Sequence, residues 1–123
     1  MQNKLFILIS TINERVLNIK SILQPFDKNI CYVISHQLTQ KPDQDSLNFI
    51  DMLIERNDII YSALANKGVA KNRNNTLEFI EHSSICLILD DDVTLCTNAL
   101  DSVMKSFEAN PSADFISYKI LDM

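Results

Sequence analysis

The segment Ile85-Cys86-Leu87-Ile88-Leu89-Asp90-Asp91-Asp92 joins five apolar residues directly to three carboxylates. A short apolar run without polar alternation is typical of a strand that is buried on both faces, as in the parallel sheets of α/β proteins. Similar runs occur at Leu5–Ile9, Ile30–Ile34, Ile59–Tyr61 and Phe115–Ile120. Together they predict an open, mostly parallel sheet of about five strands with helices on both faces.

Amphipathic stretches between these runs predict the helices. They cover approximately residues 14–23, 46–56, 68–82 and 97–110, and each carries apolar residues at helical spacing. The stripe of the second helix consists of Leu47, Ile50, Leu53 and Ile54, and that of the fourth consists of Leu100, Val103, Met104 and Phe107. Thr97 is a good N-cap for the fourth helix. A length of 123 residues with 46% hydrophobic residues fits a single domain, 1–123.

Composition excludes several classes of protein. The single glycine, Gly68, is incompatible with the glycine-rich loops of dinucleotide-binding and P-loop proteins. The net charge of −5 argues against a nucleic-acid binder, and the three cysteines show no spacing typical of a zinc site. No apolar run is long enough for a membrane span or a signal peptide. We therefore expect a cytoplasmic protein, with a peripheral position at the inner face of the membrane as a second option.

Chemistry is expected where the strands end, because open α/β sheets bind ligands at the carboxyl ends of their strands. Three adjacent carboxylates repel one another by up to ~4 kcal/mol per close pair at an effective dielectric near 20, so positive charge must compensate. In an extended segment Asp90 and Asp92 point the same way and Asp91 points to the opposite side. Oxygen ligands of this kind suit Mg²⁺ or Mn²⁺ shared with a diphosphate. The alternative is a solvated acidic turn before the next helix.

Arg73 is the second candidate. The predicted apolar face of its helix consists of Val69, Arg73, Thr76, Leu77 and Ile80. An arginine on such a face needs a partner, which could be an anion or a structural ion pair with Asp90, and these two interpretations are not exclusive. The helix N-terminus behind Gly68, with Lys67 and Lys71 beside it, adds free amides and positive charge for a phosphate.

The remaining polar residues near the strand ends have plainer interpretations. Asn13 is predicted to cap the first helix, with Glu14 as a favourable acid in its first turn. His36 and His82 lie in polar surroundings and are interpreted as surface residues, although His36 falls at the expected ligand edge.

Three blocks in order, Ile7–Arg15 (ILISTINER), Lys67–Leu77 (KGVAKNRNNTL) and Ile85–Val93 (ICLILDDDV), resemble the nucleotide-sugar-binding half of family 2 glycosyltransferases of the GT-A fold. That family shows a strand ending in a P-x-Y-N-like turn, a G-x-x-x-x-R-N helix start and a strand ending in D-x-D. The turn in this sequence lacks the proline and the aromatic residue, and Ser35-His36-Gln37 replaces the usual aspartate after the second strand. These positions contact the base, so the resemblance leaves its identity open.

The resemblance implies roles for the carboxylates. Asp92 looks like the metal ligand, aided by Asp90, with Mn²⁺ or Mg²⁺ as the cofactor. Asp90 and Asp91 also look like contacts to the ribose and to the diphosphate and its metal ion.

The same resemblance implies the nucleotide pocket. Arg73 and Asn74 look like the R-N pair that supports it, and Ser10, Thr11 and Asn13 look like the turn against the base and ribose. The implied partner is a nucleoside diphosphate sugar of the UDP or GDP type.

The implied activity is inverting glycosyl transfer in bacterial polysaccharide or glycoconjugate synthesis. The chain is expected to be truncated before the acceptor-binding segment and its catalytic base, because it stops at the strand after the D-x-D helix. Asp101, Glu108 and Asp114 are poor substitutes for the base, because they lie on or beyond a helix leading away from the site. We therefore expect donor binding without an acceptor saccharide or lipid-linked acceptor, little transferase activity from this chain alone, and pairing with a second copy through an uncovered edge as a further option.

Two other classes stay open. A receiver-like phosphotransfer domain fits the length, the α/β alternation and Lys119 on the last predicted strand, but it requires an acidic pair where this chain has Ser10-Thr11. A non-catalytic interaction domain would use the acidic cluster only as a surface.

Overall fold

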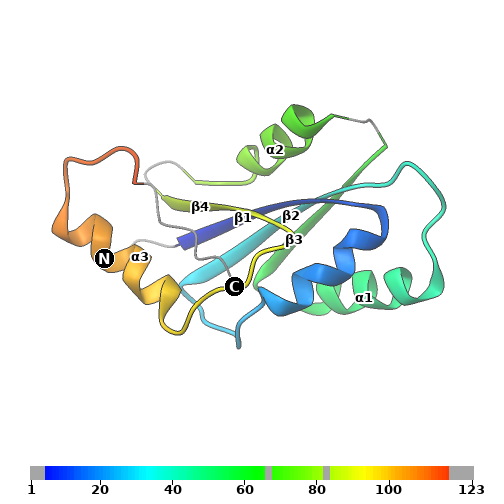
Figure 1. The fold of residues 1–123 in the computed structure, drawn as a ribbon, viewed down its shortest axis with the longest axis horizontal. Coiled ribbons are helices and arrows are strands. Elements are labelled where there is room, and N and C mark those ends of the chain that lie inside the picture. The colour runs from blue at the N-terminus through cyan, green and yellow to red at the C-terminus, as the bar shows by residue number, and fades with distance from the viewer. Residues whose placement is uncertain (1–4, 66–67, 82–83, 117–123) are drawn as a thin grey trace.

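The computed structural model describes residues 5–65, 68–81 and 84–116, and in this part of the chain strands and helices alternate (Figure 1). In chain order the elements are β1 (Leu5–Ile12), the 3-10 helix η1 (Asn13–Ser21), β2 (Ile30–Gln37), α1 (Gln44–Glu55), β3 (Ile59–Leu64), α2 (Val69–Leu77), β4 (Ile85–Asp90) and α3 (Ala99–Ala109). The predicted α/β class is confirmed.

The described strands form one open sheet in the order β3-β2-β1-β4, and every neighbouring pair is parallel. The sequence predicted about five strands, whereas the described residues contain four. Of the last predicted strand, Phe115 and Ile116 are not in a strand, and residues 117–120 lie outside the described residues. Lys67, His82 and Lys119 also lie outside them.

Helices cover both faces of the sheet, with α2 on one face and η1 and α1 on the other (Figure 1). Side chains of β1 alternate between two core clusters, as the pleat of a strand requires. Leu5, Ile7 and Ile9 pack with η1, α1 and Val103 of α3. Phe6 and Leu8 pack on the α2 face with Cys31, Val33 and partly buried Ile80.

The strands continue further than the apolar runs predicted. The predictions ended at Ile9, Ile34 and Tyr61, and each strand extends three residues beyond that point. Polar residues continue the pairing there, since Ser10 still lies opposite Ser35 in the parallel register. The apolar runs therefore predict only the central part of each strand, because polar residues contribute to the carboxyl ends of the strands.

The first helix is a 3-10 helix instead of the α-helix expected from residue 14. Val16, Ile19 and Ile22 are fully buried, and their spacing of three residues aligns them on one side of a helix with 3.0 residues per turn. Asn13 has a left-handed φ of 48° and belongs to the helix, and the preceding cap position is Ile12. The prediction that Asn13 caps the helix is therefore wrong.

Helix α1 begins two residues before its predicted start. The carboxylate of Asp43 caps it by accepting a hydrogen bond of 2.8 Å from the backbone N–H of Ser46. Ile50 and Leu53 are buried as predicted, whereas Leu47 and Ile54 are 38% and 58% exposed. The buried side of α1 therefore excludes Leu47 and Ile54, which form one edge of the predicted stripe, and includes Phe49 instead.

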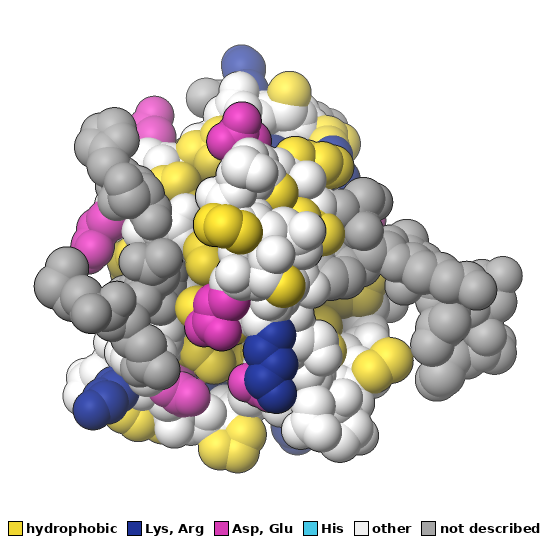
Figure 2. Space-filling view, turned by 90° about the vertical axis from the view of Figure 1, so that its left-hand side faces the viewer, with side chains coloured by type: hydrophobic (Ala, Val, Ile, Leu, Met, Phe, Trp, Pro, Cys, Tyr) yellow, Lys and Arg dark blue, Asp and Glu magenta, His cyan; other side chains and the backbone are white. Residues whose placement is uncertain are grey.

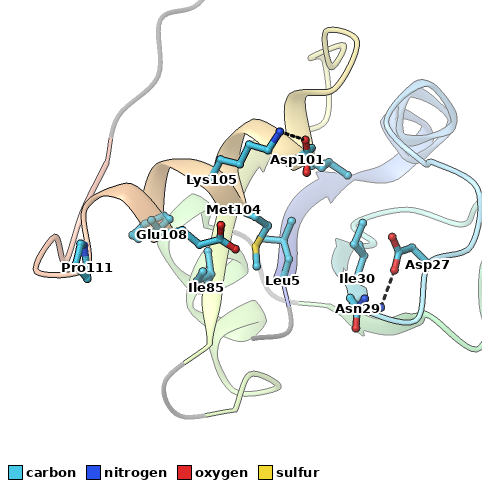
Figure 3. Close-up of a pocket in the computed structure, with 12 residues that line it drawn as sticks. Leu5, Asp27, Asn29, Ile30, Ile85, Asp101, Met104, Lys105, Glu108 and Pro111 are labelled. Carbon is cyan, nitrogen blue, oxygen red and sulfur yellow. Dashed lines mark hydrogen bonds and ion pairs between the residues drawn. The ribbon is translucent and has the colours of Figure 1, made fainter. Parts of the chain in front are cut away.

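Helix α3 confirms its predicted stripe, with Val103 buried and Leu100, Met104 and Phe107 packed against the same core. The residue before the helix is Asn98, which has a φ of 62°, so the prediction that Thr97 caps it is wrong. This helix lies beside the amino ends of the strands (Figures 1 and 3).

Candidate functional site

The carboxyl ends of β1 and β2 are tied to the first turns of α2 by side-chain amides. Asn72 Nδ2 donates to the backbone oxygen of Thr11 at 3.0 Å, and Gln37 Nε2 donates to the backbone oxygen of Gly68 at 2.9 Å. Because β4 pairs with β1 as far as Ser10 and Asp90, the acidic segment lies at this same edge. The edge thus brings together all three blocks that carry the resemblance.

Asp91 is the buried member of the three carboxylates. One of its oxygens accepts hydrogen bonds from Thr11 Oγ1 at 2.8 Å and from Arg15 Nε at 3.0 Å. The other oxygen accepts from Arg15 Nη2, so the guanidinium holds the carboxylate as a two-pronged fork. Both oxygens of Asp91 are therefore satisfied by residues of β1 and η1.

Asp90 and Asp92 are the exposed members, and each side chain is 63% exposed. Asp90 pairs with Arg73 of α2 at 3.0 Å, whereas an oxygen of Asp92 lies 3.7 Å from Arg15 of η1. The two carboxylates thus pair with arginines on opposite faces of the sheet. The prediction that they point the same way is wrong, because β4 ends at Asp90 and the chain turns at the next two residues.

The buried face of α2 is polar and differs in part from the predicted face, of which Thr76 is buried and Ile80, beyond the end of the helix, packs against the core. Val69 and Leu77 are 67% and 47% exposed, and the side chain of Arg73 is half exposed. The residues that α2 buries are Asn72 and Thr76. The ion pair of Arg73 with Asp90, one of the two interpretations that the sequence left open, is present.

This polar face matches what it covers, namely the polar carboxyl ends of the strands. Asn75 Nδ2 donates to the hydroxyls of Ser35 at 2.9 Å and of Ser62 at 3.0 Å. Asn72 Oδ1 is buried and has no hydrogen-bond partner among the described residues. Asn74, the second residue of the R-N pair, is exposed.

His36 is fully buried, so its interpretation as a surface residue is wrong. Its Nε2 lies 2.8 Å from the backbone oxygen of Asn13, and its Nδ1 lies 2.7 Å from the hydroxyl of Tyr61. Burial lowers the pKa of His36, although the hydrogen bond to Asn13 opposes this shift. Burial also raises the pKa of Tyr61 to about 12. A neutral imidazole therefore joins β2 and β3 to the first residue of η1.

Asn13 is held from two sides. Besides the His36 contact, its side chain donates to Thr39 Oγ1 at 2.8 Å and accepts from the backbone N–H of Thr39 at 3.0 Å. The left-handed backbone of Asn13 is thus fixed by its own side chain and by the buried ring. Ser10, by comparison, is partly exposed at this edge.

Arg15 is the main site residue that the sequence reasoning missed. The pKa of its guanidinium is raised, first by the hydrogen bond and the charge of Asp91 and further by the charges of Asp92 and Asp90. A signal for it existed, because the acidic cluster required positive charge and Arg15 closely follows the strand that neighbours β4. His36, Tyr61 and Asn72 left no comparable pattern in the sequence.

Two hollows lie at opposite ends of the sheet. One of about 530 Å³ lies between η1 and the carboxylates of Asp91 and Asp92. A larger one, of about 810 Å³, lies between α3 and the amino ends of β1, β2 and β4, where Leu5, Ile30 and Ile85 line it (Figure 3). Hydrophobic and acidic side chains are interspersed over that end of the molecule (Figure 2). We place the chemistry at the carboxyl edge in spite of its smaller hollow, because the charged groups converge there.

The described residues form no cluster of metal-ligating side chains and no membrane-spanning helix. There, no group of three or more His, Cys, Asp or Glu side chains is arranged to hold a metal ion. Asp90 and Asp92 are the exposed carboxylates of the acidic segment, and because they pair with arginines on opposite faces of the sheet, a cation at either one would leave most positions to water or ligand oxygens. None of the described helices has the length and apolar character needed to cross a bilayer.

Comparisons with known proteins identify the fold but no family. No family model and no curated protein matches the chain. Its structure is similar to the crystal structure of S. aureus TarS 1-349, with a TM-score of 0.66 and 18% identity over 86% of this chain and 32% of that one. A second crystal structure of S. aureus TarS gives a TM-score of 0.67 and 18% identity over 88% of this chain and 20% of that one. The chain therefore has an open parallel α/β fold of the Rossmann-like GT-A type and spans about a third or less of these TarS chains.

Proposed function

We propose that the carboxyl edge of the sheet binds a nucleoside diphosphate sugar together with Mg²⁺ or Mn²⁺, as the donor-binding part of an inverting glycosyltransferase. The observation that carries the proposal is the split within the acidic cluster, in which Asp91 is locked inside the fold while Asp90 and Asp92 are exposed on either side. TarS, whose fold the chain shares, is a family 2 glycosyltransferase, which supports the same assignment.

The residues fit a divalent cation of this kind. Asp92 offers an exposed oxygen ligand, whereas Asp90 pairs with Arg73 on the other face of the sheet, and a cation held by so few protein groups keeps positions for diphosphate oxygens and water. When bound, the cation would supply Lewis-acid stabilisation of the negative charge on the leaving nucleoside diphosphate. The protein groups bind and orient the donor beside it.

The geometry narrows the roles that the resemblance implies. Arg73 and Asn74 are exposed on the first turns of α2, where they and the free amides of the helix start can contact phosphate or ribose. Ser10 and Asn13 remain assigned to the base and ribose side. Thr11 is buried, and its hydroxyl donates a hydrogen bond to Asp91. We therefore assign Thr11 and Asp91 to holding the acidic segment in place and not to direct contact with the donor.

The catalytic base of a transferase is not assigned to this segment. Asp101 pairs with Lys105 at 2.9 Å on α3, and both line the hollow at the amino end of the sheet together with Glu108 (Figure 3). A base has to reach the acceptor hydroxyl that attacks the donor sugar, so it must lie near the carboxyl edge. We therefore propose donor binding for this chain, with acceptor binding and the base supplied by other parts of a complete enzyme.

Isothermal titration with UDP and GDP, with and without Mn²⁺, tests the proposal. We expect one of the nucleotides to bind in the presence of Mn²⁺ and Asp92→Asn to abolish that binding. Asp101→Asn is a matched control, because it removes a carboxylate at the opposite end of the sheet, and it should bind like the unaltered chain. A folded sample that gives no heat with either nucleotide, or heat that is independent of Mn²⁺, would contradict the proposal.

A further inference from the structure

Arg15 stands out because one guanidinium faces two carboxylates. Its Nε and Nη2 hold both oxygens of Asp91, and Nη2 also lies 3.7 Å from an oxygen of Asp92. The contacts of Arg15 run through these two nitrogens, and its side chain is 49% exposed. A positive charge is thus fixed beside the carboxylate that the proposed function assigns to the cation.

The fork has a first consequence for Asp91. Because both oxygens of Asp91 already accept hydrogen bonds from Arg15 and Thr11, and its side chain is only 5% exposed, Asp91 offers a cation no accessible oxygen while the ion pair holds. Of the three consecutive carboxylates, Asp90 and Asp92 are therefore the ones exposed to a ligand, each on its own face of the sheet. Breaking the pair would leave a carboxylate with 5% side-chain exposure facing a displaced guanidinium, which is costly.

The second consequence concerns charge. A free divalent cation at Asp92 would lie near the guanidinium of Arg15 and be repelled by it, whereas a diphosphate in the same place would be attracted. A cation that arrives together with a nucleoside diphosphate carries a net negative charge and is also attracted. Arg15 therefore weakens the binding of the free cation and strengthens the binding of the diphosphate, the two components of the proposed ligand.

We infer that Arg15 is a positioning residue and an internal counter-ion, which withdraws Asp91 from the cation and makes the edge take its cation together with a diphosphate instead of alone. This inference rests on the proposed function and deepens it. It assigns to η1 a part in ligand selection that differs from that of Arg73, which pairs with a single exposed carboxylate on the other face of the sheet.

Removing the charge should move the two binding events in opposite directions. Arg15→Gln is expected to tighten the binding of Mn²⁺ alone by about tenfold, as the loss of a unit charge a few ångströms from a dication in a water-like dielectric implies. The same variant should bind the Mn²⁺ complex of UDP or GDP more weakly than the unaltered chain. A residue that only supports the fold would lower both affinities together.

The test titrates Mn²⁺ into the 123-residue chain and follows the free ion by electron paramagnetic resonance, and a parallel isothermal titration uses Mn²⁺ with UDP or GDP. Arg15→Lys retains the charge but not the fork, so Mn²⁺ alone should bind it more weakly than it binds Arg15→Gln. Lys20→Gln is a matched control from the same helix, because Lys20 lines the adjacent hollow without contacting the carboxylates. Thermal unfolding of each variant checks that it is folded.

Opposite shifts in Arg15→Gln, absent from Arg15→Lys and Lys20→Gln, would support the inference. Unchanged Mn²⁺ affinity in Arg15→Gln, or a loss of both affinities, would overturn it while leaving the proposed function intact, provided that the unaltered chain binds the nucleotide with Mn²⁺. If the unaltered chain binds no nucleotide with Mn²⁺, the proposed function fails and this inference fails with it.

Discussion

Two arginine–aspartate forks lie at opposite ends of the sheet and differ in what surrounds them. At the start of β3, Arg56 holds both oxygens of Asp58, at 2.9 and 2.6 Å, and at the end of β4, Arg15 holds both oxygens of Asp91. Both aspartates are buried. The forks are alike in chemistry, so their surroundings decide what each one does.

The Arg56 fork is closed. Arg56 Nη2 also donates to the backbone oxygen of Gln24 at 2.9 Å, and its guanidinium carbon lies 5.7 Å from the centre of the Tyr32 ring. Its charge is balanced by one carboxylate. The Arg15 fork differs because Asp91, the carboxylate that it holds, lies between two exposed carboxylates in the sequence, Asp90 and Asp92. Three carboxylates face two arginines there, and the resulting surplus of exposed negative charge distinguishes the candidate site from a structural ion pair.

The largest expected effect comes from opening the closed fork. Arg56→Ala leaves the carboxylate of Asp58 buried without its cation, and we expect a loss of about 3 kcal/mol in the free energy of unfolding, measured by urea denaturation. Lys105→Ala, which breaks the exposed pair with Asp101, should leave stability unchanged. Equal stabilities of the two variants would show that the Arg56 fork is not structural.

A smaller effect is expected at the Arg15–Asp91 fork. Thr11→Val keeps the shape of the side chain but removes the hydroxyl that donates to buried Asp91, which should cost about 1.5 kcal/mol of unfolding free energy. The matched control is Thr39→Val, which removes an exposed hydrogen bond with Asn13 and should cost less than about 0.5 kcal/mol. If the control loses as much as Thr11→Val, the hydroxyl does not hold the acidic segment in place.

The smallest effect is a pH dependence that originates at the buried histidine. Because burial lowers the pKa of His36 from its ordinary 6.5, the unfolded chain takes up the proton first as the pH falls. His36 therefore contributes stability that is present above about pH 6.5 and is lost as the pH falls below that value toward the lowered pKa of the folded state. His36→Gln, which can still donate to Asn13, should show a shallower loss of stability between pH 7.5 and 5. Identical slopes for the two proteins would contradict a neutral buried ring.

The fold was largely predictable because its strands are apolar runs in their central parts. Parallel strands between two helix layers leave a sequence signal wherever both faces are apolar, as at Leu5–Ile9. The signal ends where the buried surroundings become polar, so the strand ends were missed. The predicted buried face of α2 was wrong at Val69 and Leu77 for the same reason, because Asn72 and Asn75 donate hydrogen bonds to polar groups at the strand ends. Thr76 is buried as predicted.

The candidate site was predictable as a place but not as an arrangement. Adjacent carboxylates after an apolar run marked the edge, and their mutual repulsion implied a positive partner. The expected burial of that run on both faces was wrong, because β4 is an edge strand of the described sheet and Ile88 is 60% exposed. Which arginine pairs with which carboxylate depends on the turn at Asp91-Asp92 and on the direction in which η1 follows β1. Arg15 and Arg73 lie far apart in the sequence, and no local pattern encodes that they approach neighbouring carboxylates from opposite faces.

The most direct test compares the two ends of the sheet in one measurement. Nitrogen-15 correlation spectra of the labelled chain, titrated with UDP or GDP and Mg²⁺, report every backbone amide at once. We predict shifts at residues 10–13, 72–74 and 90–92 and unchanged signals at Arg56–Asp58, and exchange of Mg²⁺ for Mn²⁺ should broaden the signals of the same carboxyl-edge amides. Shifts confined to the amino end, or no shift at either end in a folded sample, would contradict the account.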